Sequence, residues 1–146
     1  MNMKKEEISH SVSIEVSVTA QEAFSFLSNP ENLGRWALGC WDTKATNQEG
    51  IYSGTSLFDG GKSYFRVDAI PEKYIIDYHL GNSDVLRPRI SIRVIEAATI
   101  SREEPCCVIT ISAWRDSQMD DERWHRLCAT HETEVYLLKG LIEPKH

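Results

Sequence analysis

A long amphipathic helix at the carboxyl end constrains the fold of this chain more than any other segment. Apolar side chains recur there every three or four residues, which predicts a helix over residues 119–142. A helix with a continuous apolar stripe needs an apolar surface to cover, and the strands expected before it supply one. His131 lies at the centre of this stripe, which consists of Trp124, Leu127, Cys128, His131, Val135, Leu138 and Ile142.

The segments before this helix alternate between strand patterns and turn residues. Residues 8–18 alternate apolar and polar side chains, as in a half-buried strand. Thr19 and Glu22 have capping-box spacing, which predicts a first helix that begins after Thr19. Asn29-Pro30 is typical of the start of a second, short helix that carries Leu33, Trp36 and Ala37. Short connections favour antiparallel neighbours among the later strands. These strands are expected over residues 41–46, 51–58, 63–70, 73–80, 89–97 and 107–115.

This order of elements predicts an α+β fold. We expect a single domain over residues 1–146, in which a curved antiparallel sheet of about seven strands wraps around the long carboxyl-terminal helix. The order along the chain is one strand, two short helices, six strands and the long helix.

Composition excludes several classes of partner. The net charge of -6 argues against a nucleic-acid partner, because no basic patch is available to neutralise phosphates. No window is apolar enough for a membrane span, so we expect no stable membrane insertion. The amino-terminal residues lack the apolar core of a signal peptide. The cysteines form no C-x-x-C motif, which indicates free thiols and a cytoplasmic protein; they are Cys40, Cys106, Cys107 and Cys128.

The order of elements, with residues 14–24, 29–36 and 137–143, carries a likeness to a known family. The chain resembles the SRPBCC superfamily, whose members are also described as START-like, birch-pollen-allergen-like or polyketide cyclase/dehydrase proteins. The resemblance implies a helix-grip fold with a cavity between the sheet and the last helix. It also implies that this cavity holds a lipid, sterol, polyketide or other apolar molecule. The superfamily shares a fold and a pocket rather than a catalytic motif, so no residue role is transferred by position.

His131 is the strongest candidate for a functional side chain. Facing the sheet in an apolar setting, its imidazole would be mainly neutral and could bind a ligand carbonyl or exchange a proton. The alternative is a buried histidine bonded to the backbone. If the protein is an enzyme, His131 and Tyr78 are the candidate acid and base.

Aromatic and small polar side chains are the other candidates for a ligand pocket, because pockets are mainly apolar with a few placed polar groups. Thr110 and Ser112 either line the cavity or pair with neighbours across the sheet, and the pattern leaves both open. The full candidate set is Trp36, Trp41, Tyr52, Tyr74, Tyr78, Thr110, Ser112, Trp114, Trp124, Cys128 and His131.

The remaining histidine, cysteine and charged side chains do not form a pattern that predicts a metal or cofactor site. His125, Cys128 and His131 have a suggestive spacing, but His125 and His131 diverge by ~120° around the helix. We therefore expect neither a metal nor a cofactor. Strand alternation places four charged side chains opposite apolar faces, on the convex side of the sheet: Arg66, Asp68, Arg89 and Arg93.

Three functions remain open. The first is non-catalytic binding of a small apolar molecule in the cavity. The second is a cyclase- or dehydratase-like enzyme that uses a pocket histidine and tyrosine. The third is an interaction protein of the chaperone-activator type, whose interior would be filled by side chains. A homodimer is also left open.

Overall fold

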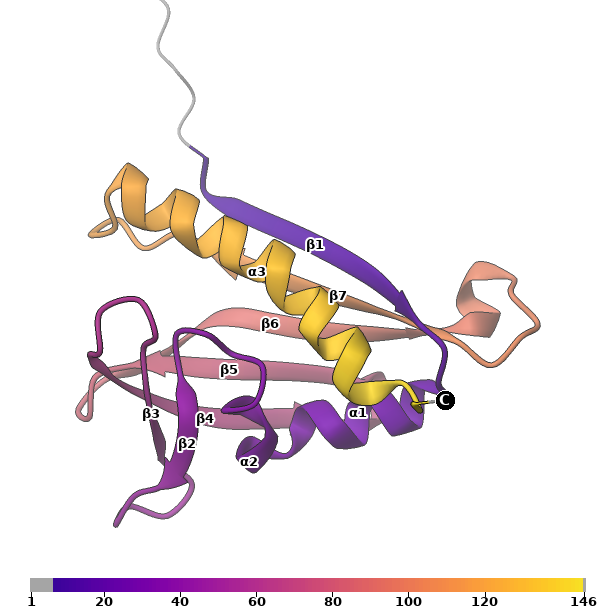
Figure 1. Cartoon of the computed structure of the whole chain (residues 1–146), viewed down its shortest axis with the longest axis horizontal. Helices are drawn as coiled ribbons and strands as arrows, with labels where there is room; N and C mark the ends of the chain where they lie inside the picture. The colour runs from indigo at the N-terminus through magenta and orange to yellow at the C-terminus, as the bar shows by residue number, and fades with distance from the viewer. Residues whose placement is uncertain (1–6, 146) are drawn as a thin grey trace, which may run out of the picture.

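The computed structural model describes residues 7–145 and contains every expected element (Figure 1). Residues 1–6, on which the signal-peptide prediction partly depends, lie outside this range. Short 3-10 turns follow the fourth and sixth strands, at Pro71–Lys73 and Ala97–Ile100. The elements are β1 (Ser9–Val16), α1 (Ala20–Ser28), α2 (Pro30–Leu33), β2 (Trp41–Ala45), β3 (Tyr52–Thr55), β4 (Lys62–Ile70), β5 (Ile75–Gly81), β6 (Leu86–Glu96), β7 (Cys107–Trp114) and α3 (Asp121–Ile142).

The strands form one seven-stranded sheet in the order β1-β7-β6-β5-β4-β3-β2. All neighbours are antiparallel. The long first strand returns to pair with the last one, which brings the two ends of the chain's sheet-forming region together at one edge. The predicted α+β helix-grip architecture is confirmed.

Local capping chemistry sets the turns at the start of α1 and α2. The Thr19 hydroxyl accepts a hydrogen bond from the Glu22 amide at 3.2 Å, and the Asn29 carboxamide oxygen accepts one from the Glu31 amide at 3.1 Å. Both bonds satisfy amides that a helix leaves unpaired at its start. The second helix ends at Leu33, earlier than expected, and Trp36 follows in a turn.

The long helix α3 begins two residues later than predicted, because Asp120 accepts a hydrogen bond from the Arg123 amide at 2.8 Å and caps it. Figure 1 shows α3 running across the sheet beside β1 and β7. Two contacts fasten its carboxyl end to β1 and the residue after it: Lys139 Nζ donates to the Glu15 carbonyl at 3.0 Å, and Glu143 accepts from the Ser17 amide at 2.9 Å. These contacts hold the apolar stripe of α3 against the sheet.

A break in the register between β5 and β6 changes one sequence-based expectation. Tyr78 pairs with Ile90 and Leu80 pairs with Arg87, so the single residue His79 lies opposite both Pro88 and Arg89. A bulge of this kind re-aims side chains. Arg89 is therefore half-buried and lines the interior, whereas we expected it on the convex side. The other three charged side chains assigned to that side, Arg66, Asp68 and Arg93, are exposed.

The apolar core lies between the sheet and the three helices. Its largest fully buried members include Leu27 from α1, Phe65 from β4, Ile92 from β6 and Leu138 from α3. A smaller cluster of Ala113, Met119 and Trp124 lies at the start of α3. None of the helices within residues 7–145 is long and apolar enough to cross a membrane.

Candidate functional site: a cavity beneath the long helix

A cavity of about 770 Å³ opens between α3 and the inner face of the sheet. This volume falls in the range of roughly 300–1,000 Å³ that is usual for small-molecule sites. Residues of α2 and the turn after it, of the loop between β3 and β4, of β4 to β7, and of α3 and the loop before it contribute to it. The cavity is therefore built from several elements between Leu33 and Glu134 rather than from one motif.

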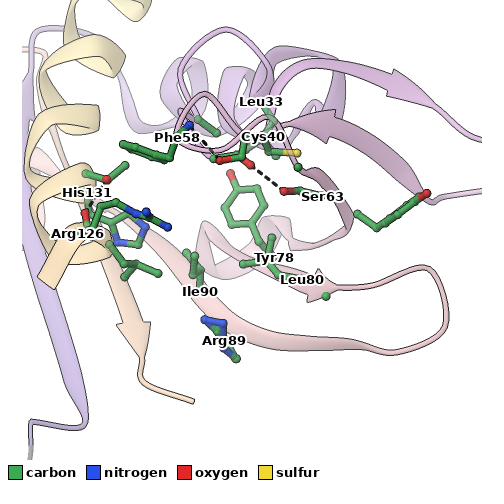
Figure 2. A pocket seen from close by; sticks show the side chains of 18 of the residues that line it. Leu33, Cys40, Phe58, Ser63, Tyr78, Leu80, Arg89, Ile90, Arg126 and His131 are labelled. Atoms are coloured by element: carbon green, nitrogen blue, oxygen red, sulfur yellow. Dashed lines mark hydrogen bonds between the residues drawn. The ribbon is translucent and has the colours of Figure 1, made fainter. Parts of the chain in front are cut away.

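The sheet side of the cavity is mainly apolar. Tyr78, Leu80, Ile90 and Ile111 line it from β5, β6 and β7. Figure 2 shows Tyr78, Leu80 and Ile90 next to one another, with Arg126 and His131 of α3 facing them. Such a surface favours an apolar ligand, because contact with it removes the ligand's carbon atoms from water.

Glu134 and His131 form a buried polar pair on α3. Glu134 Oε1 lies 3.8 Å from His131 Nε2, and the residues are only 3% and 6% exposed. Burial raises the pKa of Glu134 to about 8, although the hydrogen bond that its other oxygen accepts from the Leu38 amide at 2.8 Å opposes the rise. Burial, with the charges of His10 and Arg89, lowers the pKa of His131 to about 4. At neutral pH both groups are therefore mainly uncharged, and Glu134 carries a proton.

Tyr78 is held in place as part of the cavity wall. Its hydroxyl donates to the Leu27 carbonyl at 2.9 Å, and its ring meets Trp36 edge-on at 6.2 Å between centroids. Burial, and the nearby carboxyl of Glu134, raise the pKa of the phenol above its ordinary value. The Tyr78 hydroxyl is thus a protonated group already engaged with the backbone, which makes it a poor base.

Four cationic side chains line the cavity, and they come from three elements. Lys62 belongs to β4, Arg89 to β6, and Arg123 and Arg126 to α3. Arg126 stacks over the Phe58 ring at 5.0 Å. The Arg89 Nε is buried and has no hydrogen-bond partner within residues 7–145. The pKa of Arg89 is lowered, first by burial and also by the charge of Arg123, while Asp116 opposes that shift.

Among the candidates that the sequence suggested, Trp36, Tyr78 and His131 line the cavity. The others that face inward pack elsewhere. Tyr52 stacks on Phe65 and Tyr74 packs against Phe24, each at 5.6 Å between centroids. Trp124 is fully buried in the small cluster at the start of α3. Trp41 and Cys128 are half-buried and do not belong to the cavity lining.

In the structure, Thr110 and Ser112 of β7 pair across the sheet and do not line the cavity. Thr110 and Ser112 face outward, where they hydrogen-bond Ser13 at 2.7 Å and Ser11 at 2.8 Å across the strand pair. Trp114 follows in the same phase and is 46% exposed. The inner face is taken by the alternate residues Ile109, Ile111 and Ala113, which are buried. Side chains on one strand alternate between faces, so the two sets cannot share the cavity.

Sequence reasoning missed Glu134, Arg89 and Cys40 in the cavity. Glu134 lies three residues after His131, a spacing that puts two side chains on one helix face, so its position was available from the pattern. The inward position of Arg89 depends on the bulge between β5 and β6, which the alternation of the strand does not predict. Cys40 is buried, and burial raises the pKa of its thiol to about 12. Gly54 makes room for it, since a Cβ there would come within 2.6 Å of the Cys40 sulfur.

Metal-ligating side chains gather in one place within residues 7–145, away from the cavity. Ligand atoms of Glu15, Glu104 and Cys106 lie within 4.8 Å of one another. Arg102 already pairs with both carboxylates, at 2.7 Å and 3.5 Å, and supplies the positive charge that a cation would bring. His125 is exposed whereas His131 is buried, so these two histidines of α3 do not meet.

Comparison with known proteins shows a likeness in fold. No family model matches the sequence, and no curated protein matches it. A START superfamily protein from Mycobacterium smegmatis aligns with a TM-score of 0.67 at 13% identity, over 93% of this chain and 97% of that one. The Aha1 dimer from Colwellia psychrerythraea gives a TM-score of 0.65 at 14% identity, over 94% and 97% of the two chains.

A third similar structure is the di-domain ARO/CYC BexL from the BE-7585A biosynthetic pathway. It aligns with a TM-score of 0.66 at 14% identity, over 90% of this chain and 45% of that one. The SRPBCC, or START-like, fold that the sequence suggested is confirmed by these likenesses. At such identities they concern the fold alone.

Proposed function

We propose that this START-like protein binds a small apolar molecule in the cavity beneath α3. The observation that supports this most directly is the cavity itself, about 770 Å³ in volume and walled on its sheet side by Tyr78, Leu80, Ile90 and Ile111. An apolar interior surface left open in this way is unfavourable unless something covers it. The cavity also favours ligand binding over the chaperone-activator hypothesis, which needed an interior filled by side chains.

A pair of matched variants on α3 tests the proposal. Thr130 lines the cavity and Thr133 is exposed, yet both hydroxyls donate to the carbonyl four residues earlier. Thr130→Phe should weaken binding of the apolar fluorescent probe N-phenylnaphthylamine by at least about tenfold, because the new ring occupies the ligand's space. Thr133→Phe should leave it unchanged. Equal probe binding by both variants, or none by the unaltered protein, would contradict the proposal.

The natural ligand requires a separate experiment. Native mass spectrometry of freshly purified protein should detect a co-purified apolar molecule. The Thr130→Phe variant, prepared in parallel, should carry less of it. A ligand retained equally by Thr130→Phe and Thr133→Phe would place the bound molecule outside the cavity.

A second candidate function is acid–base catalysis of the cyclase or dehydratase type. The observation that favours it is the pairing of a protonated carboxyl on Glu134 with a neutral imidazole on His131, 3.8 Å apart at the cavity wall. Two neighbouring groups with pKa values displaced in opposite directions are typical of acid–base sites. His131 would take the proton next to a carbonyl, and Glu134 would protonate a departing hydroxyl, which leaves as water.

Dehydration of a soluble β-hydroxy ketone to the conjugated enone, followed by ultraviolet absorbance, tests this second function. Activity above the buffer rate that is lost in Glu134→Gln and kept in the exposed-residue control Glu132→Gln would support it. No rate above buffer with any of several apolar β-hydroxy ketones would leave ligand binding as the function.

The homodimer remains a prediction that one likeness supports, since the similar Aha1 structure is described as a dimer. Size-exclusion chromatography with light scattering should then give twice the chain mass of 16.7 kDa. A single species at the chain mass would rule the dimer out under those conditions.

A further inference from the structure

The charge of the cavity is opposite to that of the whole protein. The chain has 16 lysines and arginines against 22 acidic residues. The cavity lining instead has four cations, Lys62, Arg89, Arg123 and Arg126, against the carboxyls of Asp59 and Glu134. Glu134 is mainly protonated at neutral pH, and Asp59 already accepts a hydrogen bond from the Gly61 amide at 2.8 Å. The cations therefore set the electrostatic potential inside the cavity.

The three arginines of the cavity form no ion pair within residues 7–145, although the charge of Asp116 acts on Arg89 from outside the lining and opposes that of Arg123. The ion pairs formed by arginines there involve Arg102 and Arg115. Arg126 contacts an aromatic ring, and Arg89 and Arg123 form no ion pair. Unpaired guanidinium groups are ordinary at an exposed surface, but a half-buried one beside a second positive charge is costly.

Arg89 is half-buried, whereas Arg123 and Arg126 are exposed. The bulge at Pro88 and Arg89 turns the Arg89 side chain toward the interior, although the strand pattern alone would leave it in solvent. Its Nε is buried and unpartnered within the described residues, while the guanidinium also borders the cavity. Figure 2 shows Arg89 beside Ile90, at the edge of the apolar wall. A planar fork of N–H donors at that place matches a carboxylate or a similar oxyanion.

We propose that the cavity selects amphipathic anions, with Arg89 and Arg123 holding the oxyanion head group while the apolar wall of Tyr78, Leu80 and Ile90 covers the tail. The inference rests on the proposed function, because it specifies the chemical class of the ligand for the same cavity. Arg89 supplies paired N–H donors from the sheet side, and Arg123 supplies a second positive charge from α3. An oxyanion placed between them relieves their mutual repulsion and satisfies the buried Arg89 nitrogen.

Three ligands built on a twelve-carbon chain separate head-group selection from apolar binding. Dodecanoate, dodecanol and dodecyltrimethylammonium would be used at pH 7 to displace N-phenylnaphthylamine, the two ions below their critical micelle concentrations and dodecanol below its solubility limit. We expect dodecanoate to bind at least about tenfold more tightly than dodecanol, and the cationic ligand to bind most weakly. Raising the salt concentration should weaken dodecanoate binding more than dodecanol binding.

Variants locate the selecting residues. Arg89→Gln and Arg123→Gln should each reduce the dodecanoate preference by about fivefold or more without changing dodecanol affinity. Arg93→Gln is the matched control, since Arg93 is an exposed arginine of the same strand as Arg89 and outside the cavity lining. Circular dichroism checks folding. If Arg89→Gln does not fold, Arg123→Gln decides the question, because Arg123 is exposed at the rim.

Each result has a definite meaning. Equal binding of dodecanoate and dodecanol overturns the anion inference and leaves apolar binding standing. An anion preference that survives in both Arg89→Gln and Arg123→Gln also overturns it, because the head group then binds elsewhere. Failure of the unaltered protein to bind the probe or any of the three ligands would overturn the proposed function and the inference together.

Discussion

Glu134 Oε1 lies 3.8 Å from His131 Nε2 at the wall of the cavity, and neither side chain is exposed. The two groups respond to the same burial in opposite directions, because burial favours the neutral form of each. The carboxyl holds its proton to about pH 8, and the imidazole stays neutral down to about pH 4. Because the two pKa values move in opposite directions, the two groups have opposite effects on how the free energy of unfolding changes with pH.

The free energy of unfolding should be flat between about pH 4.5 and 6.5 and fall above that. In the folded protein Glu134 binds more protons than in the unfolded chain between pH 4.5 and 8, so it lowers stability as the pH rises through that window. His131 binds fewer protons between pH 4 and 6.5, so it raises stability over that range. Above pH 6.5, Glu134 is the only one of these two groups that still changes the free energy of unfolding. That free energy is expected to fall by about 2 kcal/mol by pH 8.

Urea denaturation at pH 4.5, 6.5 and 8 measures this profile. Glu134→Gln removes the carboxyl, so the stability of this variant should rise from pH 4.5 to 6.5 and then remain level. A variant that keeps the decline above pH 6.5 would show that another group causes it.

His131→Leu should keep the fold and change ligand affinity. The His131 Nδ1 is buried without a hydrogen-bond partner within residues 7–145, so replacing the ring by an apolar side chain sacrifices little. We expect the free energy of unfolding to change by less than about 1 kcal/mol and N-phenylnaphthylamine to bind a few-fold more tightly. His125→Leu, at an exposed position of α3, is the control. A large stability loss with unchanged binding would identify His131 as a structural histidine.

Trp36→Ala and Trp124→Ala should each destabilise the protein by ~3–5 kcal/mol, because they remove large side chains that are 4% and 0% exposed. Trp114→Ala provides the comparison, since this ring is 46% exposed and its loss should cost less than about 1 kcal/mol. Denaturant midpoints measure all three. Midpoints of the first two variants near that of the unaltered protein would contradict the burial of these rings.

Tyr78→Phe should destabilise the protein by about 1–3 kcal/mol, because it leaves the buried Leu27 carbonyl without the hydrogen bond it accepts at 2.9 Å. The tyrosine just before the same strand gives a matched comparison. The Tyr74 hydroxyl is 3.5 Å from the Gln21 side chain in an exposed setting, so Tyr74→Phe should cost less than about 0.5 kcal/mol. Similar losses in both variants would assign the effect to something other than this bond.

Local patterns predicted most of the fold correctly. Capping at Thr19 and Asn29 depends on side chains within three residues, and the stripe through His131 and Leu138 depends on one helical period. These signals are local in the chain, so the sequence was sufficient to predict them. The boundaries were less accurate, as at α2, which ends at Leu33 although Trp36 still packs inward.

The sequence by itself determined which elements form, in what order, and that the last helix turns His131 toward the sheet. Only the tertiary structure decided which side chains meet in the cavity. Thr110 faces outward because Ile109 and Ile111 take the inner face of β7. Arg89 faces inward because a bulge against His79 breaks the alternation of β6. Strand register and bulges depend on partners distant in the chain, and a slip of one residue exchanges the faces, so a local pattern cannot decide them.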